Sequence, residues 1–128
     1  MNIELIRGDT LDLKFQRKLI NNEVITSVPD EMYFTVKNNY NDEDYLIQKR
    51  LGESITYNEE DNYYYFTIEP EDTDGLEYSS YVYDIEIVKD GKVKTILKGK
   101  LKIKQEVTFA TNRTEVWYAR ISFKWNIK

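Results

Sequence analysis

The stretch YVYDIEIVKDGKVKTILKGKLKIK at residues 81–104 decides the fold, because its alternation and its central turn both specify two paired strands. Before the turn, every second residue of 81–87 is aromatic or aliphatic. The turn itself is Asp90-Gly91, a pair that tolerates the positive φ angles of a type I′ hairpin. The sequence therefore predicts a long β-hairpin.

The second half of this hairpin contains two contrasting sets of side chains. Successive residues of a strand point to opposite faces, so each set is expected on one face. The apolar or small set is Val93, Thr95, Leu97, Gly99, Leu101 and Ile103, and the lysine set is Lys92, Lys94, Lys98, Lys100, Lys102 and Lys104. We expect a strand with one face in a core and a lysine-coated outer face.

Alternation with period two recurs in shorter segments along the rest of the chain. The predicted strands are residues 3–6, 11–16, 32–36, 45–51, 55–57 and 63–68, with a short irregular strand at 24–26. The predicted core is formed by Leu11, Leu13, Phe15, Phe34, Val36, Phe66, Ile68, Ile85, Ile87, Leu97, Leu101 and Ile103. Together the segments predict an all-β sandwich of about seven to nine strands.

The segment EPEDTDGL at residues 69–76 is the place where a helical turn is expected. Pro70 suits the first turn of a helix, the acidic residues suit its positive end, and a glycine ends it. A tyrosine soon after such a turn can donate its hydroxyl hydrogen to backbone just upstream, as in the tyrosine corner of immunoglobulin-type sandwiches. The candidates are Tyr78, Tyr81 and Tyr83, and we favour Tyr81.

The composition limits the chemistry of the chain. Its 128 residues, 41% of them hydrophobic, are enough for one domain with its own core. The absence of cysteine and histidine excludes disulfides and thiolate zinc sites and removes the commonest general base. Paired carboxylates such as Glu69 and Glu71 lie on a predicted turn, with no nucleophile and base beside them. We therefore predict no enzyme activity, no catalytic residues, no cofactor and no metal site.

Two acidic loops and one tripeptide each allow a functional and a structural interpretation. The loops NNYNDED (38–44) and NEEDN (58–62) contain the oxygen ligands that calcium takes, but neither has the spacing of an EF-hand. Solvated turns are favoured over a weak cation site. Arg7-Gly8-Asp9 spells the integrin-binding tripeptide, but glycine before aspartate between two strands is also typical of a tight corner, which we favour.

Charge is unevenly distributed along the chain. Residues 1–88 have a net charge of −13 and residues 89–128 a net charge of +8, within a total of −5. Neighbouring strands are expected to balance part of this difference, and the remainder would attract the acidic face of another copy. The overall negative charge argues against a nucleic acid partner. No apolar run approaches the ~18 residues of a membrane span, so no membrane partner is expected.

The last residues alternate again after a break. Residues 108–115 (TFATNRTE) are a predicted linker, and residues 116–128 then place large apolar side chains on one parity. This stripe either packs on its own domain or docks on, or swaps with, a partner. We expect it to contact another subunit. The predicted interface is Trp117, Ile121, Phe123, Trp125 and Ile127, together with Lys98, Lys100 and Lys102 of the hairpin.

Several of these segments resemble one family. The chain is similar to the immunoglobulin-like N-terminal domain of phage baseplate upper proteins and related phage virion proteins. The matching stretches are RGDTLDLKFQ (7–16), FTVKN (34–38), LIQKRLGESI (46–55), EPEDTDGL (69–76), YVYDIEI (81–87), DGKV (90–93) and LKGKLKIKQEVT (97–108). They cover roughly residues 3–108 and are mostly strand and turn patterns, so the resemblance bears more on fold than on role.

The resemblance implies an immunoglobulin-like antiparallel β-sandwich over residues 1–108. The C-terminal linker and β-arm at 109–128 are predicted from the alternation and depart from the family pattern. It implies a virion structural or assembly protein: a capsid decoration, head-fibre, tail or baseplate component made in the bacterial cytoplasm. The implied partners are other virion proteins or further copies of the chain. An alternative is a carbohydrate or host-surface binding module, because 11 tyrosines and 2 tryptophans can supply a sugar-stacking platform.

Overall fold

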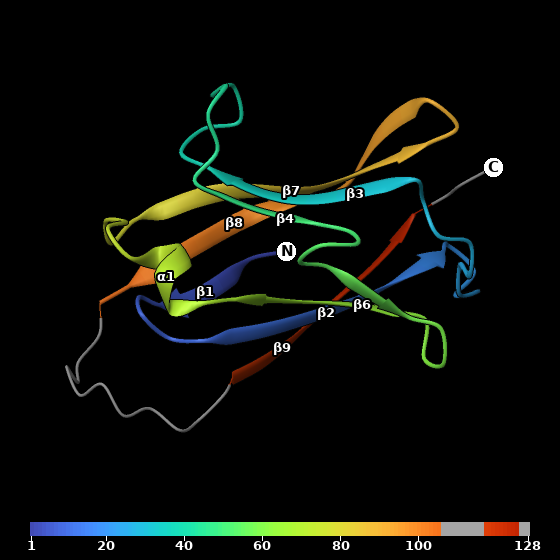
Figure 1. Cartoon of the computed structure of the whole chain (residues 1–128), viewed down its shortest axis with the longest axis horizontal. Helices are drawn as coiled ribbons and strands as arrows, with labels where there is room; N and C mark the ends of the chain where they lie inside the picture. The colour runs from blue at the N-terminus through green and yellow to red at the C-terminus, as the bar shows by residue number, and fades with distance from the viewer. Residues whose placement is uncertain (106–116, 126–128) are drawn as a thin grey trace.

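A computed structural model of the chain describes residues 1–105 and 117–125, and this part forms two stacked β-sheets (Figure 1). The five-stranded sheet has the order β1 (Ile3–Ile6), β8 (Lys92–Lys104), β7 (Ser80–Lys89), β3 (Glu31–Lys37) and β4 (Ile47–Arg50). The four-stranded sheet has the order β5 (Thr56–Asn58), β6 (Tyr63–Ile68), β2 (Leu11–Leu19) and β9 (Trp117–Trp125). The predicted all-β sandwich is confirmed.

Six of the strands follow the order of an immunoglobulin-type sandwich. The strands β3, β7 and β8 take the places of C, F and G, and β2, β6 and β5 take those of B, E and D. Two pairings are parallel, β1 with β8 and β2 with β9, and the other pairings between strands are antiparallel. Among the described residues, no helix has the length and apolar content needed to cross a membrane.

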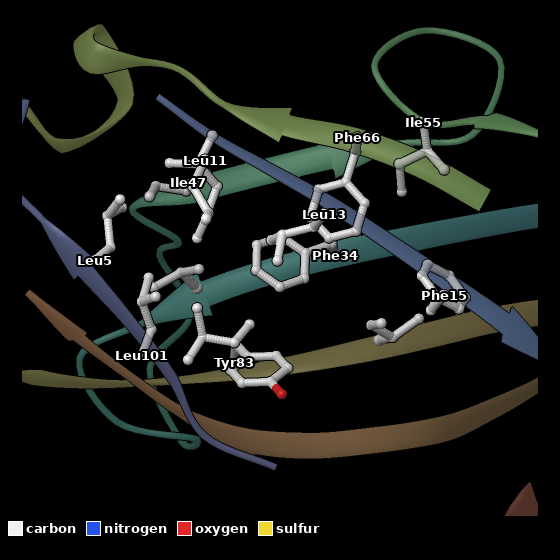
Figure 2. Close-up of a cluster of buried hydrophobic side chains, with 14 of the residues drawn as sticks. Leu5, Leu11, Leu13, Phe15, Phe34, Ile47, Ile55, Phe66, Tyr83 and Leu101 are labelled. Carbon is white, nitrogen blue, oxygen red and sulfur yellow. The ribbon is translucent and has the colours of Figure 1, made fainter. Parts of the chain in front are cut away.

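The core lies between the two sheets and is built around aromatic rings. Phe34 of β3 meets Phe66 of β6 across the gap, with 4.7 Å between ring centroids, and also packs against Tyr83 of β7 at 5.4 Å. Phe15 stacks on Tyr64 at 5.0 Å. Figure 2 shows the side chains of Phe15, Phe34, Phe66 and Tyr83 converging from both sheets with those of Leu13 and Leu101. Every predicted core residue is buried except Leu97, which is partly buried.

A β-bulge in β8 corrects the predicted faces of the hairpin. Ile85 of β7 pairs with Leu97, but the next residue, Glu86, pairs with Thr95, so Ile96 is an extra residue without a partner. An extra residue inverts the alternation beyond it. Val93, predicted to face inward, is therefore 64% exposed, and Thr95 is exposed too. The prediction of one continuous lysine face from residue 92 to residue 104 was wrong, because the bulge divides that series.

The tight turn of the hairpin is confirmed, whereas several strand boundaries differ from those predicted. Asp90 and Gly91 both have positive φ, 51° and 75°. The strand predicted at 11–16 continues to residue 19, because β9 pairs with it as far as Leu19. The strand predicted at 45–51 is limited to the four residues that pair with β3. The irregular strand predicted at 24–26 is a single bridge between Lys18 and Val24.

The predicted helical turn is α1 (Pro70–Thr73), which connects the two sheets between β6 and β7. Glu69 and Asp72 cap its first turn reciprocally, with the Glu69 amide donating to Asp72 Oδ2 at 2.7 Å. Asp72 Oδ2 also lies 2.7 Å from Lys49 Nζ, so α1 is tied to β4 by an ion pair. The turn is thereby held across the end of the sandwich (Figure 1).

The predicted tyrosine corner is confirmed at Tyr81, whose hydroxyl donates to the Glu77 carbonyl oxygen at 2.8 Å while its ring is buried.

We expect Tyr81→Phe to lower the free energy of unfolding by about 1 kcal/mol, since the variant keeps the ring and leaves a half-buried carbonyl without this donor. Urea denaturation measures the change. The control is Tyr45→Phe, at a residue that is 55% exposed, where no change is expected. Equal effects at both positions would contradict the corner.

Tyr83 fastens the N-terminus to the core. Its hydroxyl donates to the Met1 carbonyl oxygen at 2.7 Å. A Cβ on Gly99 would collide with this oxygen and with the Tyr83 ring, which explains a glycine in the apolar series of β8. Burial raises the pKa of the Tyr83 hydroxyl to about 12, and the negative charge of ionised Tyr40 makes a smaller contribution in the same direction.

This raised pKa predicts a loss of stability in alkali. A tyrosine in the unfolded chain ionises near pH ~10, so between about pH 10 and 12 the unfolded state releases a proton that the folded state keeps. The contribution of Tyr83 is therefore complete below pH ~10 and falls as the pH rises through the folded pKa of about 12. Phenolate absorbance should show a late-titrating hydroxyl that Tyr83→Phe removes. An unchanged titration in that variant would show that another hydroxyl is responsible.

Candidate interaction surfaces

The first candidate surface is the C-terminal strand β9. It pairs in parallel with β2 through nine residue pairs, from Leu11 beside Trp117 to Leu19 beside Trp125. The register sets Ile121 beside Phe15 and Phe123 beside Arg17, and both of these β2 residues are buried. Ile127 and the predicted linker lie outside the described residues. Of the two alternatives for this segment, the structure has it paired within its own chain.

The second candidate surface is the lysine series of β8. Beyond the bulge, Lys98, Lys100 and Lys102 remain exposed on the outer face of the five-stranded sheet. They are not paired with β9, because β8 and β9 belong to different sheets. The predicted interface is therefore two separate surfaces rather than one.

Neighbouring strands balance part of the lysine charge, as expected from the sequence. Lys98 pairs with Asp84 of β7, and its ammonium lies 5.1 Å from the centre of the Tyr40 ring. Lys102 pairs with Glu4 of β1, and Lys104 Nζ lies 2.7 Å from a Glu4 carboxylate oxygen. A hydrogen bond and the charge of Lys104 lower the pKa of Glu4. The ion pair between Lys104 and Glu4 is exposed, so its contribution to stability is small.

A shallow depression of about 260 Å³ lies on the outer face of the same sheet, over β3, β4 and β7. Its lining combines two tyrosines with amide, hydroxyl, ammonium and carboxylate groups, contributed by Tyr33, Thr35, Lys37, Glu43, Tyr45, Gln48, Asp84 and Glu86. Gln48 Nε2 donates to Thr35 Oγ1 at 3.2 Å, and the Tyr33 hydroxyl donates to Glu31 Oε1 at 2.5 Å. Burial raises the pKa of Asp84, while Lys37 and Lys98 lower it.

Sequence reasoning did not single out this depression. Tyr33 and Thr35 alternate along the chain with the predicted core positions Phe34 and Val36, but nothing in one strand shows which neighbours lie beside it. The pairing of β3 with β7 brings Thr35 beside Asp84, and its pairing with β4 brings Thr35 beside Gln48. The signal that the sequence did contain was the row of polar and aromatic residues on the outward parity of each strand.

The tripeptide Arg7-Gly8-Asp9 is a corner between β1 and β2. The Arg7 guanidinium donates to the Leu76 carbonyl oxygen at 3.3 Å and to the Tyr78 hydroxyl at 2.5 Å. Gly8 has φ +86°, and its amide donates to Thr73 Oγ1 at 3.0 Å. These bonds attach the corner to α1 and to the segment after it, in agreement with the structural interpretation.

The acidic loops form no metal-ligand group in the described part of the chain, where no three carboxylates come together in a position to hold an ion. In the second loop, Asp61 accepts instead from the Tyr65 hydroxyl, and this hydrogen bond lowers the pKa of Asp61.

We expect the melting temperature to be unchanged by EDTA, measured by differential scanning fluorimetry with and without added calcium. A large drop on chelation would establish a structural cation site at residues 38–44 or 58–62.

No protein-family model matches the chain, and no curated protein matches it. Among solved structures, the chain is similar to a leucine-rich repeat protein from Bacteroides thetaiotaomicron VPI-5482, at 12% identity and a TM-score of 0.32. The match covers 93% of this chain and 14% of that protein, so this chain spans about a seventh of its length. A likeness at this level carries no argument about function, and the resemblance to phage virion proteins stays a prediction from the sequence.

Proposed function

We propose that the chain is a structural and assembly protein of a bacteriophage virion that acts through protein contacts and not through catalysis. The phage assignment rests on the sequence motifs of residues 3–108. The observation that best supports an assembly role is β9, which completes the four-stranded sheet from one edge and is joined to β8 only through residues 105–116. Edge strands of this kind are elements through which sheets of separate chains join.

The site chemistry fits this proposal. The carboxylates of the depression lie on one open sheet face, and the chain has neither histidine nor cysteine to act as base or nucleophile. The predicted partners are other virion proteins or further copies of the chain, in a capsid decoration, head fibre, tail or baseplate. The chain would act by surface complementarity in any of these positions.

Co-purification from phage-producing cells tests the proposal. An affinity-tagged full chain, expressed during particle formation, should band with particles in a density gradient and remain bound at moderate salt. An equally tagged, unrelated β-sandwich is the control for trapping. Recovery of the chain only in the soluble fraction would contradict a virion role.

A second candidate function is carbohydrate or host-surface binding, and the depression over β3, β4 and β7 favours it. Tyr33 and Tyr45 line it with aromatic rings, and Gln48 and Asp84 offer an amide and a carboxylate for sugar hydroxyls. A glycan array tests this function, followed by titration of any bound glycan with Tyr45→Ala. The matched control is Tyr78→Ala, at an exposed tyrosine outside the depression. No binding on the array would reject this candidate.

A further inference from the structure

One edge of β2, on the side away from β6, is paired with the C-terminal strand β9. In an immunoglobulin-type sandwich the N-terminal strand lies beside strand B in the sheet that also holds E and D. Here β1 lies in the other sheet, paired with β8, and β9 takes the place beside β2. On the side of β2 that faces away from β6, β9 is the strand that pairs with all nine of its residues. Unpaired backbone groups at a sheet edge are templates for another strand.

The connection that leads to β9 is much longer than the gap that it crosses. β8 ends with Lys104 beside Ile6, and β9 begins with Trp117 beside Leu11. The connection from β1 to β2 crosses between the same two sheets at the same end with only four residues, 7–10. The connection from β8 to β9 has twelve, 105–116. The eight additional residues can span up to about 26 Å at roughly 3.3 Å per residue, more than twice the ~10 Å between stacked sheets.

The β2 edge of a second copy offers β9 the same backbone pairing as the β2 edge of its own chain. Among the described residues β9 pairs with β2 and with no other strand. An identical β2 edge on another copy offers the same register and the same hydrogen bonds, so exchange costs no contact at this edge. The balance between the two forms is then set by local concentration and by any additional contact between the two bodies.

Charge at this edge does not distinguish the two forms. The register sets Arg120 beside Lys14 and Lys124 beside Lys18, so basic residues are paired with basic residues whether β2 belongs to the same copy or to a neighbour. The choice between the two forms therefore depends on the connector and on concentration.

We infer that copies of this chain exchange β9, so that β9 of one copy pairs with β2 of the next in the register Leu11 to Trp117. This inference rests on the proposed assembly function and names its partner as a second copy of the same chain. At low concentration β9 closes its own sheet. At the high local concentration of an assembly it closes the sheet of a neighbour, and the surplus connector length permits the crossing.

Mixed single-cysteine variants test the exchange, because the chain has no cysteine of its own. Gln16 and Ser122 are register partners, and matched residues of paired strands lie within the ~4.4 to 6.8 Å Cα separation of a disulfide. Gln16→Cys and Ser122→Cys chains are refolded together from urea at about millimolar concentration, near the effective concentration of a tethered strand. After oxidation, we expect a disulfide-linked dimer on a non-reducing gel, well above the background of either variant alone.

Two controls define the register. The mixture of Gln16→Cys with Tyr118→Cys is displaced by four residues, or about 13 Å along the strand, and should give only background dimer. The double variant Gln16→Cys/Ser122→Cys, at micromolar concentration, should form the disulfide within one chain. If the double variant links internally while the mixture gives no more dimer than the displaced pair, exchange is overturned. If neither links, the register itself is wrong and the inference fails with it.

Shortening the connector separates exchange from the proposed function. Deletion of residues 108–113 leaves six residues between β8 and β9, still more than the four between β1 and β2. The shortened chain should fold and keep the internal disulfide in the double variant. Deletion of residues 106–115 leaves only two residues, fewer than the four that join β1 to β2, so β9 should then pair only with a neighbour and the double variant should give a linked dimer. A folded, internally linked monomer with the two-residue connector would overturn exchange. Absence of the full chain from virions would reject the proposed function alone, and failed exchange with virion binding intact would reject this inference alone.

Discussion

Phe34→Ala is expected to lower the free energy of unfolding by about 3 to 5 kcal/mol, which is a large part of the stability of a domain of this size. The Phe34 side chain is fully buried, contacts Phe66 of the opposite sheet and packs against Tyr83 of its own sheet. Removing the ring leaves a cavity between two sheets whose backbones are held apart by the surrounding side chains, so little collapse can compensate. Urea denaturation followed by tyrosine fluorescence measures the change.

The matched control for Phe34→Ala is Val93→Ala, which also tests the bulge. Val93 belongs to the apolar parity of the hairpin in the sequence but is 64% exposed. Its truncation should change the free energy of unfolding by no more than about 0.5 kcal/mol. A loss of more than about 1 kcal/mol at Val93 would show that the alternation continues through Ile96 and that the bulge is misplaced. A small loss at Phe34 would show that the faces of β3 are inverted.

Truncation after Thr108 is expected to leave a folded monomer that no longer assembles. The truncated chain keeps the eight strands from β1 to β8, which form both sheets without β9. The truncated chain loses the ladder beside β2, so its free energy of unfolding should fall while its β-rich circular dichroism spectrum remains. Light scattering after size exclusion measures the assembly of both forms over a concentration series.

Two outcomes of the truncation would correct this account. If the chain truncated after Thr108 is unfolded, β9 is required for the sandwich itself and not only for contact with a partner. If it folds and assembles as the full chain does, the contact lies elsewhere, and Lys98→Glu, Lys100→Glu and Lys102→Glu then test the outer face of β8. A truncated chain that folds normally, stays monomeric and does not assemble is the result that agrees with exchange of β9.

The sequence by itself determined the class of the fold and most of its local structure. Period-two alternation predicted the core-facing residues of β2, β3, β6 and β7, because in a half-buried strand hydrophobicity and face are coupled residue by residue. Backbone preferences of single residues predicted the turn at Asp90-Gly91 and the helical turn at Pro70. Tyr81 was identifiable for the same reason, since its partner at Glu77 is only four residues away.

Only the tertiary structure decided which strands lie side by side. The place of β9 beside β2, the place of β1 beside β8 and the depression over β3, β4 and β7 all depend on pairings between distant segments, which alternation within one strand does not encode. The bulge at Ile96 has the same origin, because its extra residue appears only when β8 is aligned with β7. Hydrophobic pattern assigns a residue to a face, whereas hydrogen bonding across the sheet assigns a strand to its neighbour.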